Sequence, residues 1–445
     1  MTAFAENLVD AFESQKHLLS GDESGAVANM RSESLKAATR LGLPSFRDEH
    51  WKYTNVSALV SGMGDRAFRI PENDQNTGGT ARGIEAINEQ TPAFASTRLV
   101  FIDGNLAEHL SQTDSIASGV SVKRISELLA DNDSVVASSL NSESLKSSVF
   151  AQINTSFIQD GAIIEVDSGA AAGSIEVVFA ESGAYQLTCP RLIVKAGANS
   201  TLTIIETHLS LSVPENGSEN GLTSAVTEIH ADRGSNVEHF RLQFDRRAHH
   251  IGNVKLNAAA DATISTHSIA LGGKLTRIDI DGSLNERGSH IDMFGLFVAN
   301  DNQHIDHHTR IDHLAPNTTS NENFKGIADD EGRGVFNGKI FVKQDAQKIS
   351  AIQSSRNLLL SDNAEIDTKP ELEIYADDVK CAHGATVGQL SEDEMFYLRA
   401  RGIDYSTART ILTVAFAGDI VDGISNETLR KNVESRVSAL ITATK

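Results

Sequence analysis

The stretch that decides the fold runs from Ala364 to Leu390 and reads AEIDTKPELEIYADDVKCAHGATVGQL. It predicts short strands interrupted by Asp and Lys-Pro, ending in a Cys-x-His pair. Side chains alternate between faces in an extended backbone, so we expect Val379, Cys381 and His383 on one face. A thiol and an imidazole side by side are soft metal ligands or reactive groups. The alternative is a buried small thiol beside a hydrogen-bonded histidine.

The same β-rich texture extends from about residue 161 to about residue 390. Short runs of β-forming residues, such as AIIEV, SIEVVFA and RLIVKA, are separated by Gly, Asn, Asp or Ser. No helical stretch of ten or more residues interrupts them, which argues against a doubly wound α/β domain with its helical crossovers. A sandwich is possible. The many short, irregularly spaced runs favour a solenoid of β-coils, in which each coil buries its apolar face against its neighbours.

Helical patterns flank the β-rich segment on both sides. We expect residues 1–157 to form a mostly helical N-terminal region with a linker, residues 158–390 the β-helix core, and residues 391–445 a C-terminal helical domain. Ser391 and Glu394 form a capping box that starts the first helix of this tail. A tail of about 55 residues is marginally stable alone. We therefore expect it to pack on the β-rich core or on a partner.

Composition restricts the class of protein. The formal net charge is −21, from 60 acidic and 39 basic residues, which argues against nucleic acid and against an anionic membrane surface as partners. Two cysteines do not make a disulfide framework. The first residues lack the pattern of a secretion signal, and no apolar run approaches the roughly 20 residues of a membrane span. We expect a soluble cytoplasmic protein.

A histidine-rich stretch, HIDHHTRIDH, is the first candidate for a metal site. Its four histidines are His304, His307, His308 and His313. In an extended backbone His304 and His308 share one face, whereas His307 and His313 share the other. A metal site needs three or four converging ligands. We therefore expect a stacked or hydrogen-bonded cluster, with acidic neighbours such as Asp306 as partners.

An acidic series surrounds the Cys-x-His pair. It comprises Glu365, Asp367, Glu371, Glu373, Asp377 and Asp378. Paired carboxylates and bound calcium on a β-helix are typical of enzymes that cleave acidic polysaccharides. The alternative is a solvated outward face, since Leu372 and Ile374 take the opposite side of the strand. We favour the solvated face.

Several motifs are absent from the sequence. There is no G-x-x-x-x-G-K-S/T phosphate loop and no G-x-S-x-G nucleophile elbow. An iron–sulfur cluster needs about four ligands, mostly thiolates. Because Cys189 is distant in sequence, Cys381 and His383 would hold such a cluster only with ligands from another subunit.

The run RNLLLSDNAEIDTKPELEIYADDVKCAHGATVGQL closely resembles the SufD subunits of the SufBCD iron–sulfur cluster assembly machinery. The flanking runs GRGVFNGKIFV and DEMFYLRARGIDYSTARTILTVAFAGDIV agree, and WKYTNVSALV, which begins at Trp51, is similar to a segment of the same subunits. The strong resemblance covers about residues 332–421. Gly384 follows the histidine where the sister SufB subunits usually carry Glu. Ala382 replaces the Ser that is common in the family.

The resemblance implies a right-handed parallel β-helix core between helical N-terminal and C-terminal regions. It implies a non-catalytic scaffold that pairs with a SufB-like subunit through the β-helix and binds a SufC-like ATPase through the C-terminal helices. It associates His383 with a nascent cluster, and hence with metal, at the subunit interface, and it leaves the role of Cys381 open. No cofactor is expected on the isolated chain, only a transient iron–sulfur cluster in the complex. The alternative function is a polysaccharide-cleaving β-helix enzyme.

Overall fold

The computed structural model describes residues 3–21, 24–57, 59, 68–71, 87–181, 187–211, 221–245 and 249–443. Its helices are α1 (Ala3–Gln15), η1 (Lys16–Leu18), α2 (Ala26–Leu41), η2 (Glu49–Trp51), η4 (Glu108–Leu110), α5 (Ile125–Ala130), α6 (Ser134–Leu140), η5 (Glu143–Leu145), α7 (Val149–Phe157), α8 (Glu392–Arg399), α9 (Tyr405–Val421) and α10 (Glu427–Ala443). None of these helices combines the length and the apolar character that crossing a membrane requires.

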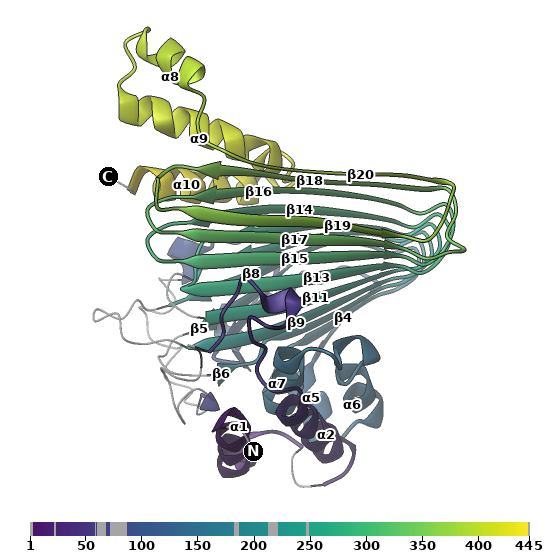
Figure 1. The fold of residues 1–445 in the computed structure, drawn as a ribbon. Coiled ribbons are helices and arrows are strands. Elements are labelled where there is room, and N and C mark those ends of the chain that lie inside the picture. Colours follow the sequence, from purple (N-terminus) through teal and green to yellow (C-terminus); the bar gives the residue numbers. More distant parts are fainter. Residues whose placement is uncertain are drawn as a thin grey trace.

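The strands form two large sheets, and the strands of successive coils lie stacked one above another in Figure 1. Sheet A contains β2 (Asn105–Leu106), β1 (Thr97–Ile102), β5 (Ala171–Glu181), β8 (Thr201–Ser210), β10 (Asn236–Gln243), β12 (Thr263–Ala270), β14 (His290–Ala299), β16 (Thr319–Ala328), β18 (Ile349–Leu359) and β20 (Val379–Gly388), in that order. Sheet B runs from β19 (Glu365–Ile374) through β17 (Arg333–Val342), β15 (His304–His313), β13 (Leu275–Leu284), β11 (His249–Ala258), β9 (Leu222–Ala231), β7 (Arg191–Ala196) and β4 (Ala162–Val166) to β3 (Val120–Arg124), with β6 (Leu187–Thr188) paired to β9.

The chain alternates between the two sheets from β7 to β20. Each strand therefore pairs in parallel with the strand two positions further along the chain, for example β10 with β12 and β12 with β14. This arrangement is a parallel β-solenoid, not a sandwich of antiparallel sheets. The prediction of a β-solenoid core between helical regions is confirmed.

The turns that lead into sheet A carry a repeat that the strands do not show. A residue with positive φ lies two positions before each of six sheet A strands: Gly169, Asn199, Gly234, Asp261, Gly288 and Asn317. Glycine, asparagine and aspartate are the residue types that accept this left-handed backbone most readily. The backbone N–H of Asn199 donates to the carbonyl of Arg233, in the next turn, at 2.9 Å. The turns therefore stack on one another like the strands.

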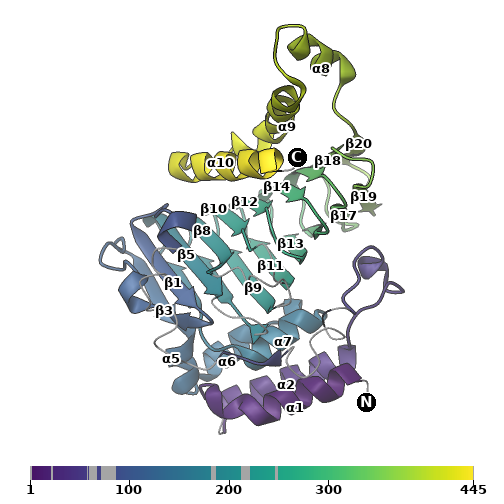
Figure 2. The ribbon, with the colours of Figure 1, turned by 90° about the vertical axis from the view of Figure 1, so that its left-hand side faces the viewer.

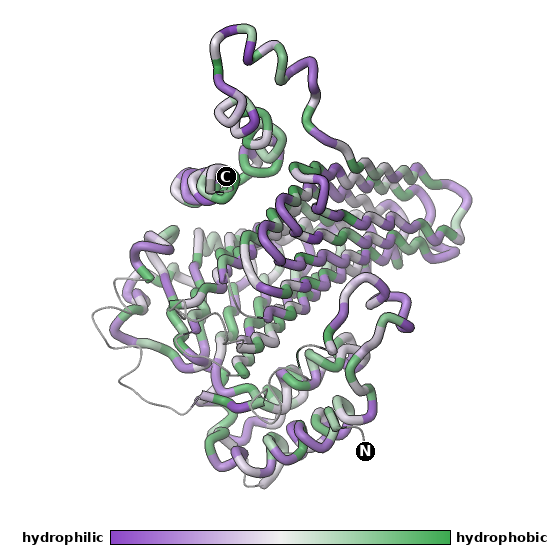
Figure 3. The backbone as a smooth tube through the Cα atoms, turned by 60° about the vertical axis from the view of Figure 1, so that its left-hand side comes forward, coloured by the Kyte–Doolittle hydropathy of each residue, from purple (hydrophilic) through white to green (hydrophobic). Residues whose placement is uncertain are grey.

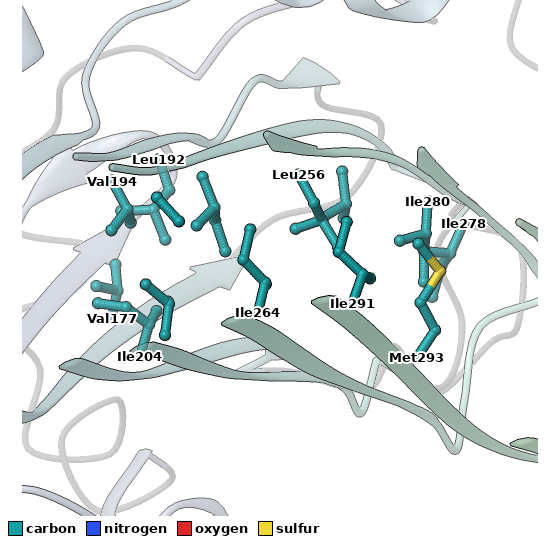
Figure 4. Packing of buried hydrophobic residues seen from close by; sticks show 14 of the residues in the cluster. Val177, Leu192, Val194, Ile204, Leu256, Ile264, Ile278, Ile280, Ile291 and Met293 are labelled. Atoms are coloured by element: carbon teal, nitrogen blue, oxygen red, sulfur yellow. The ribbon is translucent and has the colours of Figure 1, made fainter. Parts of the chain in front are cut away.

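The core lies between the two sheets, where inward side chains from both interdigitate (Figure 4). Hydrophobic and hydrophilic residues alternate along the strands, as the tube in Figure 3 shows, because successive side chains point to opposite faces. Large aromatic rings fit inside because glycine lies opposite them on the neighbouring strand. Gly295 is in register with Phe324, and Phe297 is in register with Gly326.

The N-terminal helices lie at the end of the solenoid where its first strands are found (Figure 2). Helix α7 is buried along its whole length. Phe150 and Phe157 of this helix share a core cluster with Leu8 of α1 and with Ile251 of β11. Strands β1 and β3 extend the two sheets at this end, where β1 pairs with β5 and β3 pairs with β4.

The C-terminal helices leave the opposite end of the solenoid. Helices α9 and α10 pack on the outer face of sheet A, where Ile420 and Leu429 join a cluster with Phe240 and Leu296. Helix α8 projects away from the solenoid (Figures 1 and 2). It begins as expected from the sequence, since the Ser391 hydroxyl accepts a hydrogen bond from the backbone N–H of Glu394.

The contact between Gly295 and Phe324 gives a test of the packing. A Cβ added at Gly295 would lie 2.1 Å from a ring carbon of Phe324, so Gly295→Ala should destabilise the fold by about 1–3 kcal/mol through overpacking. Gly388→Ala is the control, because no described atom lies within 4 Å of its added Cβ. Urea unfolding of both variants measures the difference, and equal stabilities would contradict this account of the packing.

Candidate functional site

Strand β20 forms the free edge of sheet A. It pairs with β18 on one side, and no other described strand pairs with it. Every residue from Ala382 to Gly388 is exposed. An edge strand presents unpaired backbone N–H and C=O groups, which makes it a template for strand addition. The Cys-x-His pair lies on this edge.

Cys381 and His383 share one face of β20, as the alternation predicted, and this face is in register with the inward face of β18. Cys381 is in register with Ala351 and packs partly buried against a small apolar cluster that includes Ile349. His383 is exposed and is in register with Gln353. Burial raises the pKa of the Cys381 thiol above its ordinary value. Burial thus disfavours the thiolate, which is the nucleophilic form of cysteine.

The described residues do not complete a metal site around this pair. Among them, no group of three or more His, Cys, Asp or Glu side chains is arranged to hold a metal ion. Cys189, the other cysteine, is buried in the N-terminal core cluster, and burial raises its thiol pKa. The structure thus places Cys381 and His383 together and leaves Cys189 elsewhere.

The histidine-rich stretch is β15, and its histidines are divided between the two faces as predicted. On the outer face, His304 contacts the Thr54 hydroxyl at 2.9 Å and His308 contacts Asp306 at 3.2 Å. On the inner face, His307 contacts the Ser268 hydroxyl at 2.9 Å. His313 is also inward and contacts two hydroxyl groups, those of Thr318 and Ser320.

Trp51 packs against the outer face of sheet B. The Arg277 guanidinium lies 3.6 Å from the centre of the Trp51 ring. The same guanidinium donates to the carbonyl of His50 at 2.7 Å and pairs with Asp306 at 3.1 Å. The cation–π contact and the hydrogen bond to His50 therefore hold the N-terminal segment against β13, and the buried ion pair links β13 to β15.

Four members of the acidic series lie on the outer face of β19 and two in the turn after it, and three of those on β19 pair with cations. Glu371 pairs with Lys369 and Glu373 pairs with Lys339. Leu372 and Ile374 point to the opposite side, as predicted, and pack on the cluster that also contacts Cys381. This arrangement favours the solvated face over a polysaccharide-cleaving site.

Sequence reasoning missed a set of polar side chains inside the solenoid. The Glu206 carboxylate contacts the rings of His208 at 2.6 Å and His239 at 3.1 Å, and it accepts a hydrogen bond from Thr227 at 2.7 Å. Burial alone would raise the pKa of Glu206, but the hydrogen bonds from the two histidines and the charge of Arg241 hold it well below its ordinary value. The only signal in the sequence was polar residues at inward-facing positions of strands.

Glu322 is a second buried carboxyl group, and it lies closer to the Cys-x-His edge. It is fully buried on β16 and accepts a hydrogen bond from the side-chain amide of Gln353. No cation pairs with it among the described residues, and burial raises its pKa to about 7.

The chain with this solenoid, edge pair and flanking helices matches two family models of iron–sulfur cluster assembly proteins. The SUF system FeS cluster assembly, SufBD core domain, matches residues 178–416, and the SufBD protein N-terminal region matches residues 2–174. The chain belongs to the SufBD family.

Two relatives match along nearly their whole length. An iron–sulfur cluster assembly SufBD family protein of Synechocystis sp. is 31% identical over 95% of this chain and 93% of its own length. The iron–sulfur cluster assembly protein SufD of Escherichia coli is 30% identical over 95% of this chain and 95% of its own length. The resemblance noted in the sequence is thereby confirmed.

The raised pKa of Glu322 predicts a pH-dependent stability. Between pH 4.5 and about 7 the carboxyl ionises in the unfolded chain but stays neutral in the native protein, so the free energy of unfolding falls as the pH rises. The loss reaches about 3 kcal/mol above pH 7, at roughly 1.4 kcal/mol per tenfold change in the ionisation constant.

Glu322→Gln should therefore become more stable than the wild-type protein above pH 7, with the difference shrinking towards pH 4.5. Urea unfolding at several pH values measures it, with the exposed Glu108→Gln as the control. Parallel stability curves for wild type and Glu322→Gln would contradict the assignment.

Proposed function

We propose that this chain is a non-catalytic scaffold subunit of an iron–sulfur cluster assembly complex. In this role it pairs with a SufB-like subunit through the open end of the solenoid, binds a SufC-like ATPase through its C-terminal helices, and contributes His383, with Cys381 beside it, to a nascent cluster at the subunit interface. The observation that carries the proposal is the thiol–imidazole pair on an exposed strand that has a pairing partner on one side only.

The open end of the solenoid has the properties of an interface. Strand β20 offers backbone groups for pairing with a strand of a partner. Beside it, Leu372, Ile374 and Val379 are only partly buried against the apolar cluster of the last coil. A related solenoid whose strands continue the two sheets would cover these side chains. It would also provide hydrogen-bond partners for the free backbone groups of β20.

The number of ligands supports a shared site. An iron–sulfur cluster takes about four ligands, mostly thiolates, and this edge supplies one thiol and one imidazole. Pairing at β20 would bring ligands of the partner to Cys381 and His383. The cluster is cargo in this scheme, so the isolated chain is expected to hold none stably.

The C-terminal tail has an exposed apolar surface at its tip. Phe396 on α8 is 74% exposed, and Tyr397 and Tyr405 are also exposed. Exposed aromatic residues on a projecting element are typical of a protein–protein contact. The sequence has no phosphate loop of its own, so nucleotide hydrolysis in such a complex would belong to the partner.

A reciprocal pull-down tests the two interfaces. Val387 lies exposed on β20, and Val387→Lys should weaken capture of the SufB-like subunit about tenfold or more, because it places a charge in an apolar contact. Phe396→Ser should do the same for the SufC-like ATPase. Each variant is the control for the other, and loss of both partners by either variant would contradict two separate surfaces.

Cluster assembly in the reconstituted complex tests the role of His383. His383→Ala should lower the amount of cluster, measured as iron and sulfide per complex and by visible absorbance, because one ligand of the site is lost. His109→Ala is the control, since His109 is exposed and lies on η4, away from β20. Unchanged cluster yield in the His383→Ala complex would remove this residue from the site.

A further inference from the structure

Inward side chains of the solenoid stack in columns, with one residue from each strand of a sheet. One column of sheet A ends at His383. In register below it come Gln353 on β18, Glu322 on β16 and Met293 on β14. Neighbouring strands lie about 4.8 Å apart, so the Gln353 side chain is the immediate neighbour of the His383 ring in this column.

The hydrogen bond to Glu322, the next residue of the column, sets the orientation of the Gln353 amide. Gln353 is 1% exposed, and its Nε2 donates a hydrogen bond to the Glu322 carboxyl. The amide oxygen, Oε1, accepts no hydrogen bond from any described residue, although it is buried. The residue beyond Glu322 in this column is the apolar Met293. Gln353 and Glu322 are therefore not part of a longer chain of polar side chains in this column. A buried amide oxygen without a donor is uncommon in proteins.

We propose that Gln353 is a positioning residue for His383. In the assembled complex the amide oxygen of Gln353 accepts the N–H of one ring nitrogen of His383, which leaves the other ring nitrogen deprotonated and directed at the metal. Glu322 contributes by holding the amide so that its oxygen, and not its NH2 group, faces the histidine. This inference rests on the proposed role of His383.

The chemistry agrees with what a histidine ligand requires. A ring nitrogen binds metal only when it carries no proton, and a hydrogen bond from the other nitrogen fixes that tautomer and the ring orientation. His383 is exposed, so without such an acceptor its ring would be free to rotate and to exchange tautomers. Loss of such a partner typically lowers metal affinity 10–100-fold.

The test measures metal binding by the assembled complex, with Co²⁺ as a spectroscopic probe for ferrous iron. Gln353→Met keeps the volume and removes the acceptor, so we expect about a tenfold or greater loss of Co²⁺ affinity. Gln243→Met is the matched control, since Gln243 is a fully buried inward glutamine on β10. Where the Gln353→Met complex does not assemble, Gln353→Asn, whose oxygen is withdrawn by one methylene, should show the same loss.

A double variant separates the proposed role from a merely structural one. The double variant Glu322→Gln with Gln353→Glu exchanges the two residues and keeps the buried composition. It places a carboxylate next to His383, so the Co²⁺ affinity of its complex should be at least that of the wild-type complex. Equal Co²⁺ affinity of the Gln353→Met, Gln243→Met and wild-type complexes would overturn the inference, as would failure of the double variant to restore binding. If His383→Ala also leaves Co²⁺ binding unchanged, the proposed function fails as well.

Discussion

The parallel backbone ladder between coils is the constraint on which the rest of the structure depends. From β10 to β20 the strands of sheet A pair without an irregularity in register. A residue in register with an inward residue of the neighbouring strand also points inward. Side chains far apart in sequence therefore lie next to each other on adjacent strands of the sheet. The ladder explains why glycine faces phenylalanine across a strand boundary, and why Gln353 lies between Glu322 and His383.

The same ladder makes the last coil unlike the others. Each coil buries its apolar side chains and satisfies its backbone against the coils on both sides. Strand β20 has a coil on one side only, so its backbone groups and its inward side chains are open. The N-terminal end is covered by α7 and the helices that pack on it. The exposure of His383 and the partial exposure of Cys381 thus follow from their place in the solenoid.

Much of this arrangement could be predicted from the sequence, because it depends on local alternation. The shared face of Cys381 and His383, the divided histidines of β15 and the solvated acidic face of β19 all follow from the two-residue period of a strand. The columns could not be predicted. Which residue stacks on which depends on turn length, and the turns of this solenoid vary. Glu322 and Gln353 are 31 positions apart, and nothing local relates them.

The attachment of α9 has a mechanical consequence. The buried Lys325 ammonium on β16 pairs with Asp419 and donates to the carbonyl of Phe416, both on α9. Arg356 on β18 lies 3.9 Å from the same carboxylate. These contacts fix the C-terminal part of α9 to two adjacent strands, and Arg409, near its N-terminal end, pairs with Asp329 just after β16. The N-terminal end of α9 leads to the projecting tip. A force applied at that tip would be transmitted by α9 to β16 and β18 of sheet A. Strand β18 is the direct neighbour of β20, the edge strand that carries the thiol and the imidazole.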